Sequence, residues 1–402
     1  MKKISRNIFT MICILSLLAG LTACGIEKPD LETKAQIESS GSSSASEDKK
    51  KSFEIKDSHL TLDLNERLHV DALVSGNSIN SLSGYGLKTP DLTEDQIADI
   101  LMSNGRSEYK ETDSGEKIYS NDKENLSIRF VDKTPEARSS SPALIYSLDK
   151  GKEYYYVVSN IMFGDPDIDA DAEKAAALVK DKLDKLHVEY GALAVSHTDH
   201  DQLNSLYGIF IKDQKEQKEF DQAVSDGNVI IDYSPYISSL LYGPLDENFQ
   251  FTADDDIYII SGNIMFKELP VKTNDVYEFP SIKAAVSSRG IEYLYLDNLY
   301  SPENSFGGSP VIPVEDAVDS FRKAFEAASD KLDITIDSIF LAYLKDYSED
   351  ASSSTKYSYV PVWTIGYSGT DGDKSVTYAY CHISASDGQI LTADSNLFVT
   401  TE

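Results

Sequence analysis

One short segment near the middle of the chain combines side chains that could bind a metal ion. It reads His197-Thr198-Asp199-His200-Asp201, so two imidazoles and two carboxylates fall within five residues. His and Asp are both zinc ligands. However, the segment fits the end of a strand that runs into a loop, which gives the two histidines no common face. A structural zinc site would also require further Cys or His ligands. We therefore favour a solvated loop.

The run from Asp165 to Asp171 carries a carboxylate at every second position, which is the oxygen-rich pattern of a calcium loop. Such a loop requires Gly at its sixth position and a bidentate Glu at its twelfth, and these positions hold Ala170 and Ala176. The acids also suit the first turn of a helix whose other end is basic, because the macrodipole favours that arrangement. We expect capping and no calcium site. The helix would begin with Asp169, Asp171 and Glu173 and end with Lys180, Lys182 and Lys185.

Cys381 and His382 are adjacent and could be taken for a thiol nucleophile and its base. Neighbouring residues on a strand point to opposite faces of a sheet, so we expect these two side chains to diverge. Cys381 shares its face with Ser375, Thr377 and Ala379. We interpret it as a small buried thiol.

Aromatic residues are concentrated in the C-terminal strands. Such rings stack on sugars or bury a peptide, but cross-strand aromatic pairs also stabilise antiparallel sheets, and we favour the structural role. The sequence contains no glycine-rich phosphate loop, no GxSxG elbow and no HExxH motif, so no catalytic residue, metal site or cofactor is predicted. If the aromatic residues do bind a ligand, the candidates are Tyr357, Tyr359, Trp363, Tyr378 and Tyr380.

The first 23 residues have the pattern of a secretory signal. A basic head precedes an apolar run from Ile8 to Leu18 that is too short to span a bilayer, and Leu21-Thr22-Ala23-Cys24 follows. This box resembles the bacterial lipoprotein signal. The resemblance implies that the Cys24 sulfur receives a diacylglyceryl group and that cleavage makes Cys24 the acylated N-terminus. We expect a protein anchored by lipid to the outer face of the cell membrane.

The chain is strongly acidic, with a formal net charge of −30 at pH 7. The charged residues that leave with the signal are all basic, so cleavage makes the chain more acidic. An acidic surface repels nucleic acid and anionic lipid head groups, so nucleic acid is excluded as a partner. The lipid, not a basic patch, would hold the protein at the membrane. Once Cys13 leaves with the signal and Cys24 is lipidated, Cys381 has no partner for an intramolecular disulfide, so stability must come from burial.

Residues 24–52 are polar and rich in serine, which predicts a lipidated N-terminus followed by a disordered linker. The remainder predicts an α+β fold of antiparallel sheets, each covered by one amphipathic helix, in two or three tandem units. The expected boundaries are 1–23 for the signal peptide, 53–150 and 151–270 for two α+β units, and 271–402 for a C-terminal helix-plus-sheet unit.

The N-terminal unit has a helix with a complete start signal. Thr93 would be the N-cap, Gln96 would close a capping box, and Leu92 with Ile97 would form a hydrophobic staple. Alternating apolar and polar residues predict strands on both sides of it. These strands are Leu60–Leu64, Leu68–Val74, Ser107–Glu111, Lys117–Ser120 and Leu126–Val131.

The middle unit is predicted to contain a helix over Asp169–Leu186, with a face of Ala, Val and Leu, and an acidic loop over Asp246–Asp256. Val158-Ser159-Asn160-Ile161-Met162-Phe163 and Ile260-Ser261-Gly262-Asn263-Ile264-Met265-Phe266 are similar, which indicates a repeated strand, helix and hairpin unit. The predicted strands are Glu153–Ser159, His187–Ser196, Leu206–Lys212, Val229–Tyr236 and Ile257–Ser261.

The C-terminal unit is predicted to consist of a helix over Val314–Ala328 and strands over Ile334–Leu344, Tyr357–Tyr367 and Val376–Ser384. With Val360-Pro361-Val362-Trp363 and Ile383-Ser384-Ala385-Ser386-Asp387-Gly388, these segments resemble two groups of proteins. One group is the uncharacterised clostridial lipoproteins of the DUF6034 type, and this resemblance covers most of the chain. The other is the PepSY-like modules, including the YycH and YycI regulators, and it covers about the last hundred residues.

Both resemblances imply an exported accessory or interaction protein, and neither brings a catalytic motif. We therefore expect a non-catalytic binding or accessory protein with an envelope-protein or cell-wall partner. The alternative is a secreted envelope hydrolase whose paired carboxylates meet only in the fold.

Overall fold

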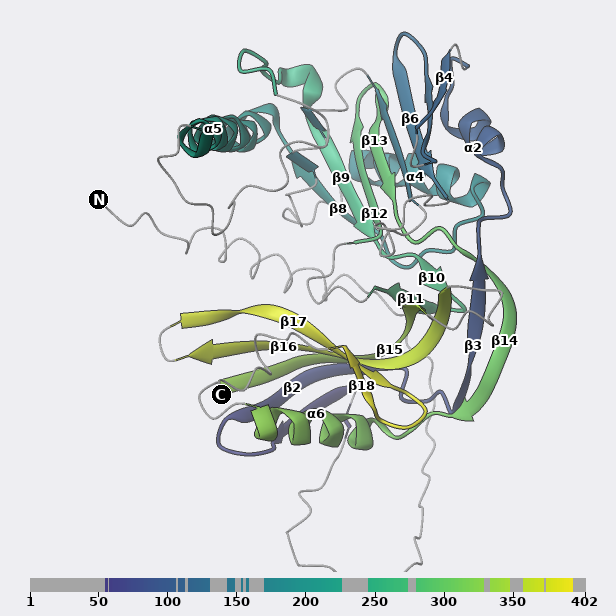
Figure 1. Cartoon of the computed structure of the whole chain (residues 1–402), viewed down its shortest axis with the longest axis vertical. Helices are drawn as coiled ribbons and strands as arrows, with labels where there is room; N and C mark the ends of the chain where they lie inside the picture. Colours follow the sequence, from purple (N-terminus) through teal and green to yellow (C-terminus); the bar gives the residue numbers. More distant parts are fainter. Residues whose placement is uncertain are drawn as a thin grey trace, which may run out of the picture.

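The computed structural model describes residues 55–56, 58–105, 108–112, 115–130, 143–148, 153–154, 157–158, 170–225, 245–273, 280–328, 333–347, 357–371 and 374–392. The signal segment, Cys24, the linker, the predicted strand Val229–Tyr236 and most of the Asp165–Asp171 run lie outside these residues. Within them the protein is a mixed α+β structure of two β-sheets and four helices, as the sequence predicts at that level (Figure 1).

The first sheet joins strands from both ends of the chain. Its main path runs in the order β1, β2, β15, β16, β17 and β18, while β3 connects β14 to β16 and β11 connects β10 to β15. The strands are β1 (His59–Asp63), β2 (Leu68–Ser75), β3 (Ser81–Lys88), β10 (Met265–Phe266), β11 (Leu269–Lys272), β14 (Ser301–Pro310), β15 (Asp333–Tyr347), β16 (Tyr357–Asp371), β17 (Lys374–Ser384) and β18 (Ile390–Thr392).

This sheet is not purely antiparallel, which corrects the prediction. β15 runs parallel to β2, with Ile336 opposite Val70, and parallel to β11, with Tyr343 opposite Val271. Hairpins impose the antiparallel direction on neighbouring strands, whereas strands joined by a long connection are free to pair in parallel. The whole second sheet lies between β2 and β15 along the chain.

Helix α6 (Val314–Ala328) covers one face of the first sheet, with the bounds that the sequence predicts. Ala317, Val318, Phe321 and Phe325 are all buried along it, as expected for residues at helical spacing on one face. The ring of Phe321 packs 5.1 Å from the ring of Tyr367 on β16. The apolar stripe therefore fixes which face of the sheet is the core face.

The second sheet has the order β4, β5, β6, β7, β13, β12, β9 and β8, and all its pairings are antiparallel. Helix α2 (Glu94–Leu101) and helix α4 (Ala170–Lys185) lie together at this sheet (Figure 1). The strands are β4 (Glu108–Glu111), β5 (Lys117–Ser120), β6 (Glu124–Arg129), β7 (Ala143–Leu148), β8 (Ala194–Thr198), β9 (Ile257–Gly262), β12 (Ile282–Ser287) and β13 (Gly290–Leu296).

Several local predictions are confirmed. Thr93 and Gln96 form the reciprocal capping box that starts α2, and the hairpin β4–β5 has the predicted position. α4 lies within the predicted Asp169–Leu186 range, and the apolar face of that range is buried. The buried residues are Ala172, Ala175, Ala176, Val179, Leu183 and Leu186.

Two predicted strands are helices, and a third, His187–Ser196, is strand only from Ala194, where β8 begins. Leu206–Lys212 lies inside helix α5 (His200–Ser225), which starts where Asp199 and Gln202 cap each other reciprocally. The described residues of Glu153–Ser159 are also helical, and Tyr154, Val157 and Val158 are fully buried at helical spacing. Short apolar runs fit a buried strand and a buried helix equally, and in both segments packing in a second core decides for the helix.

The strands do not group along the expected boundaries. Within 53–150, β1 to β3 join the first sheet and β4 to β7 join the second, and within 271–402 β12 and β13 belong to the second sheet. The two similar segments also differ, because Val158 is helical whereas Ile260 lies in β9. Similar side chains in the two segments therefore lie in different secondary structure.

Candidate functional site

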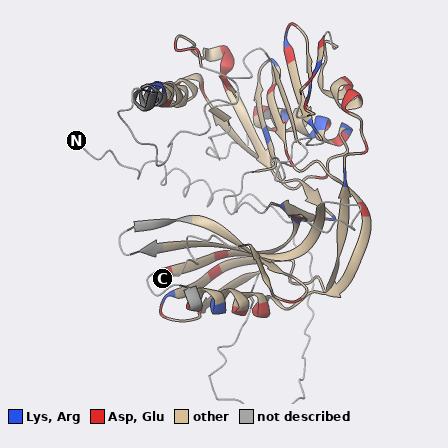
Figure 2. Ribbon diagram, viewed as in Figure 1, with Lys and Arg blue, Asp and Glu red and all other residues tan. Residues whose placement is uncertain are grey.

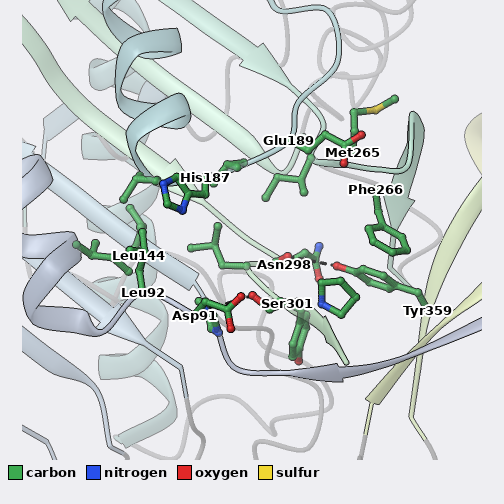
Figure 3. Close-up of a pocket in the computed structure, with 18 residues that line it drawn as sticks. Asp91, Leu92, Leu144, His187, Glu189, Met265, Phe266, Asn298, Ser301 and Tyr359 are labelled. Atoms are coloured by element: carbon green, nitrogen blue, oxygen red, sulfur yellow. Dashed lines mark hydrogen bonds between the residues drawn. The ribbon is translucent and has the colours of Figure 1, made fainter. Parts of the chain in front are cut away.

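A cavity of about 310 Å³ lies where the chain passes between the two sheets (Figure 3). The chain passes between the sheets four times, and three of these connections border the cavity: β3 to α2, β9 to β11, and β13 to β14. Each of them contributes to the wall, through Asp91, Met265 and Asn298 among others. We call this space the hinge cavity, because a molecule bound in it would touch all three connections.

Apolar side chains form a little more than half of the lining of the hinge cavity. Ile97 from α2, Leu144 from β7 and Ile264 before β10 line it and are buried, as is Tyr359 from β16. Its volume is at the lower end of the range of small-molecule sites.

Polar residues stand at the rim. Asp91 forms an ion pair with Lys88, at 2.7 Å between Oδ1 and Nζ, and its backbone N–H donates to Ser301 Oγ. His187 and Glu189 follow the end of α4 and are exposed. Figure 3 shows Glu189 beside Met265, with Asp91 on the other side of the cavity near Ser301.

Backbone in the left-handed region is concentrated around this cavity. Of the five described non-glycine residues with positive φ, His187 and Asn298 line the cavity, and Lys267 and Glu268 directly follow its lining residue Phe266. Each such residue costs about 1–3 kcal/mol and persists only where the surrounding structure enforces it. Strain of this kind clusters at ligand sites, which makes the hinge cavity the strongest functional candidate among the described residues.

Glu189 holds part of this strained backbone in place. Its Oε2 accepts the N–H of Lys267 at 3.2 Å, and its Oε1 accepts the N–H of Glu268 at 2.9 Å. Lys267 and Glu268 form the two-residue turn between β10 and β11, and both have φ near the values of a type I′ turn, which normally takes Asn and Gly. The carboxylate therefore supplies a hydrogen-bond acceptor for a turn that the local sequence does not favour.

Aromatic rings join the hinge cavity to the first sheet. The ring of Phe266 lies 5.5 Å from that of Tyr359, and Tyr300 lies 6.5 Å from Tyr359. Tyr85 and Tyr343 continue the cluster, and the Nζ of Lys267 lies 4.2 Å from the centre of the Tyr85 ring.

The five aromatic residues singled out from the sequence do not form one surface. Tyr359 lines the hinge cavity, and Tyr357 packs 5.6 Å from Tyr300. Trp363 lies on the same face of β16 but is buried beneath α6, where its Nε1 donates to the Ile312 carbonyl at 3.0 Å. Tyr380 of β17 lies opposite Gly366 of β16, and Tyr378, two residues before Tyr380, is on the same, other face of the sheet. The two-residue period of strands separates them from Trp363.

Tyr378 belongs to a polar cluster on that other face. Its hydroxyl donates to Asp337 Oδ1 at 2.7 Å and lies 2.9 Å from Ser338 Oγ. Burial raises the pKa of Asp337 to about 6, although the hydrogen bonds from Tyr378 and Ser338 oppose this. A Cβ at Gly366 would collide with both hydroxyl groups, so only glycine allows them to meet.

His197 and His200 do not form a metal site with one another. His197 lies on β8, packed against the ring of Tyr258, whereas His200 is the first residue of α5 and not part of a loop as predicted. His200 Nδ1 lies 2.8 Å from Asp256 Oδ1, and this hydrogen bond raises the pKa of His200. No described group of three or more His, Cys, Asp or Glu residues could hold a metal ion.

Cys381 and His382 diverge as predicted. Cys381 is buried on the face covered by α6, and burial raises the pKa of its thiol to about 12. His382 points to the other face, where its Nδ1 lies 3.0 Å from Thr364 Oγ1. Burial, with some help from Lys272, lowers the pKa of His382 to about 3. A neutral thiol and a neutral imidazole on opposite faces cannot act as a nucleophile and its base.

A second cavity of about 570 Å³ lies between α4 and the second sheet, and several of its polar side chains have partners. Arg289, which lines it, bridges two buried carboxylates, with Nη2 at 2.9 Å from Asp255 and Nε at 2.7 Å from Glu292. Lys182, which lines it, donates to the Ile100 carbonyl at the end of α2. These contacts provide hydrogen-bond and ion-pair partners for the carboxylates of Asp255 and Glu292 and for the Ile100 carbonyl.

Glu189, His187 and Asn298 were missed by sequence analysis. Among the residues with positive φ at the cavity, Asn298 and His187 are of types that adopt this conformation more often than most, whereas Lys267 and Glu268 are not. No local pattern marks Glu189, because its hydrogen-bond partners lie 78 and 79 residues further along the chain.

No family model and no curated protein match this chain. A solved structure of an uncharacterized protein from Eubacterium rectale ATCC 33656 is similar in fold, with a TM-score of 0.50 and 16% sequence identity. The match covers 84% of this chain and 94% of that one. A similar fold is therefore found in that protein.

Proposed function

We propose that this chain is a lipid-anchored extracytoplasmic binding protein that holds a small ligand in the hinge cavity without catalysis. The observation that carries the proposal is the cavity itself, which is lined by three of the connections between the sheets and bordered by four of the five described left-handed non-glycine residues. Such backbone strain persists at ligand sites because the geometry it creates serves binding. We further propose that the two sheets, with α4 and α6 as their covering helices, act as two units whose relative position the ligand fixes.

The proposed location rests on the sequence. Lipid on Cys24 would hold the protein on the outer face of the cell membrane, with residues 24–52 as a tether, and an envelope protein or the cell wall would be the partner. No helix among the described residues is long and apolar enough to cross a membrane. The acidic charge disfavours nucleic acid as a partner.

The hydrolase alternative has less support. The buried carboxylates of Asp255 and Glu292 do approach one another, but Arg289 lies between them and neutralises both. The pair of His200 and Asp256 is half-buried and lines neither of the two cavities.

Ligand retention tests the proposal. The full-length protein is incubated with an extract of its own cell envelope, repurified, and analysed by mass spectrometry for bound small molecules. Val188→Trp, which fills the wall of the cavity, serves as the blocked variant, with its fold verified by circular dichroism. We expect a compound that the parent retains unchanged and the variant loses. Equal retention by both proteins would contradict the site, and recovery of a cleaved compound would support the hydrolase.

Membrane fractionation tests the anchor. We expect Cys24→Ala to move the protein from the membrane to the soluble fraction, with Cys381→Ala as the matched control. If Cys24→Ala stays as tightly bound as the parent, the lipid anchor is wrong.

A further inference from the structure

We infer that the hinge cavity selects a cationic amphiphile, whose apolar or aromatic part enters the cavity while its ammonium group binds Glu189. This inference rests on the proposed function and names the ligand class of that same site.

The charges that line the cavity favour a cation. Among the described residues that line it, Asp91 and Glu189 are the charged ones, and none is Lys or Arg. His187 and two tyrosines are the other titratable side chains of this lining. Lys88 offsets the charge of Asp91. An anionic ligand would meet the carboxylates without a compensating cation.

Glu189 keeps an uncompensated charge. Its two oxygens accept backbone N–H groups of Lys267 and Glu268, which are neutral donors, and it forms no ion pair within the described part of the chain. Each oxygen retains a further lone pair. Lys185, four residues before Glu189, pairs with Asp181. Lys267 directs its Nζ to the ring and hydroxyl of Tyr85 and also lies 5.7 Å from the centre of the Phe266 ring. A ligand ammonium can therefore pair with the carboxylate without displacing a protein cation.

Aromatic rings lie on the same side of the cavity as Glu189. Figure 3 shows Phe266 below Glu189 and Met265, with Tyr359 beyond it. The faces of such rings attract cations. The interior beyond them consists of buried apolar side chains such as Ile97 and Leu144, which suits the uncharged part of the ligand. The cavity thus offers charged and polar side chains at its rim for the ammonium group and buried apolar side chains for the rest of an amphiphile.

The field of the whole protein acts in the same direction. The formal net charge is −30, α2 presents acidic side chains, and the lysines of α4 alternate with acidic residues (Figure 2). A surface of one sign raises the local concentration of ligands of the opposite sign. Cations would therefore reach the cavity more often than anions.

Three probes that share one skeleton and differ in charge test this inference. Phenylbutylamine, phenylbutanol and phenylbutyrate are titrated by calorimetry at pH 7 into the full-length protein, held in nanodiscs of zwitterionic lipid, with empty nanodiscs as the blank. We expect the amine to bind at least tenfold more tightly than the acid, which is a difference of ~1.4 kcal/mol in binding free energy. The Val188→Trp variant should bind none of them.

Glu189→Gln removes the charge while the amide oxygen still accepts a hydrogen bond. We expect it to reduce the preference for the amine to below about threefold, because the Coulomb attraction is lost, and to leave phenylbutanol binding within about twofold, because one of the two bonds to the turn remains. Glu108→Gln on the exposed strand β4 removes the same charge far from the cavity and should change nothing.

Equal binding of the acid and the amine, or an amine preference that survives Glu189→Gln, would overturn the inference. An envelope compound that is retained at the cavity but carries no cationic group would also overturn it while leaving the proposed function in place. Retention that Val188→Trp does not affect would instead reject the cavity as the binding site.

Discussion

The carboxylate of Glu189 accepts a hydrogen bond from the backbone N–H of Glu268 at 2.9 Å, although the two residues are 79 positions apart in the sequence. The same carboxylate accepts the N–H of Lys267. These two bonds connect the segment after α4 to the turn before β11, and thereby the second sheet to the first.

Removing this acceptor should destabilise the protein. We expect Glu189→Ala to lower the free energy of unfolding by about 1–3 kcal/mol, because two donors of a strained turn lose their partner. Glu189→Gln retains one acceptor oxygen and should cost less. Urea denaturation measures both, with Glu108→Ala on β4 as the control. A Glu189→Ala variant as stable as the parent would show that the turn needs no external acceptor.

The core beneath α6 is expected to depend on Phe321. This ring is fully buried and packs against Tyr367, so Phe321→Ala should lower the free energy of unfolding by roughly 3–5 kcal/mol through lost burial and an unfilled space. Lys323→Ala, an exposed position on the same helix, should change it by less than about 0.5 kcal/mol. A loss below about 1 kcal/mol for Phe321→Ala would mean that α6 contributes little to the core.

Glu124 should make stability depend on acidic pH. Burial raises the pKa of this carboxyl group, but hydrogen bonds from Asn121, Asn104 and Ser103 together lower it by more than burial raises it. The net result is a pKa of about 2, compared with the usual 4.5. A lowered pKa stabilises the folded state above the unfolded value of 4.5, and this contribution disappears as the pH falls towards 2. Glu124→Gln should therefore destabilise the protein most at pH 7 and progressively less below pH 4.5.

Chemical denaturation of the parent and Glu124→Gln at several pH values between 7 and 3 checks this dependence. Tyr146→Phe removes one neutral donor to the same carboxylate and should show a smaller effect. A difference between parent and Glu124→Gln that does not change with pH would contradict the low pKa.

Gly366 should tolerate no side chain. A methyl group there would collide with the hydroxyl groups of Ser338 and Tyr378 and separate Tyr378 from Asp337. We expect Gly366→Ala to cost about 1–3 kcal/mol, as overpacking does. Combining it with Tyr378→Phe and Ser338→Ala, which remove the two hydroxyl oxygens, should recover part of the loss. Thermal unfolding of the single and triple variants measures this, and a neutral Gly366→Ala would refute the close approach.

The sequence by itself determined the features that depend on neighbouring residues. Thr93 and Gln96 cap α2 through three residues of chain, and the apolar spacing along Val314–Ala328 defines α6 and its buried face. The alternation of a strand was sufficient to place Cys381 and His382 on opposite faces. Such patterns act over a few residues, so they can be recognised before the fold is known.

Only the tertiary structure decided the hinge cavity, the parallel pairing of β2 with β15, and the helical state of Leu206–Lys212. The cavity wall takes residues from Pro90 to Tyr359, and its strained backbone at Lys267 is stabilised by Glu189 from a distant segment. The apolar run at Leu206 fits a strand or a helix until the second core is present to accept one face of it. In each case the deciding energy comes from contacts between segments far apart in the chain, and no local pattern records those contacts.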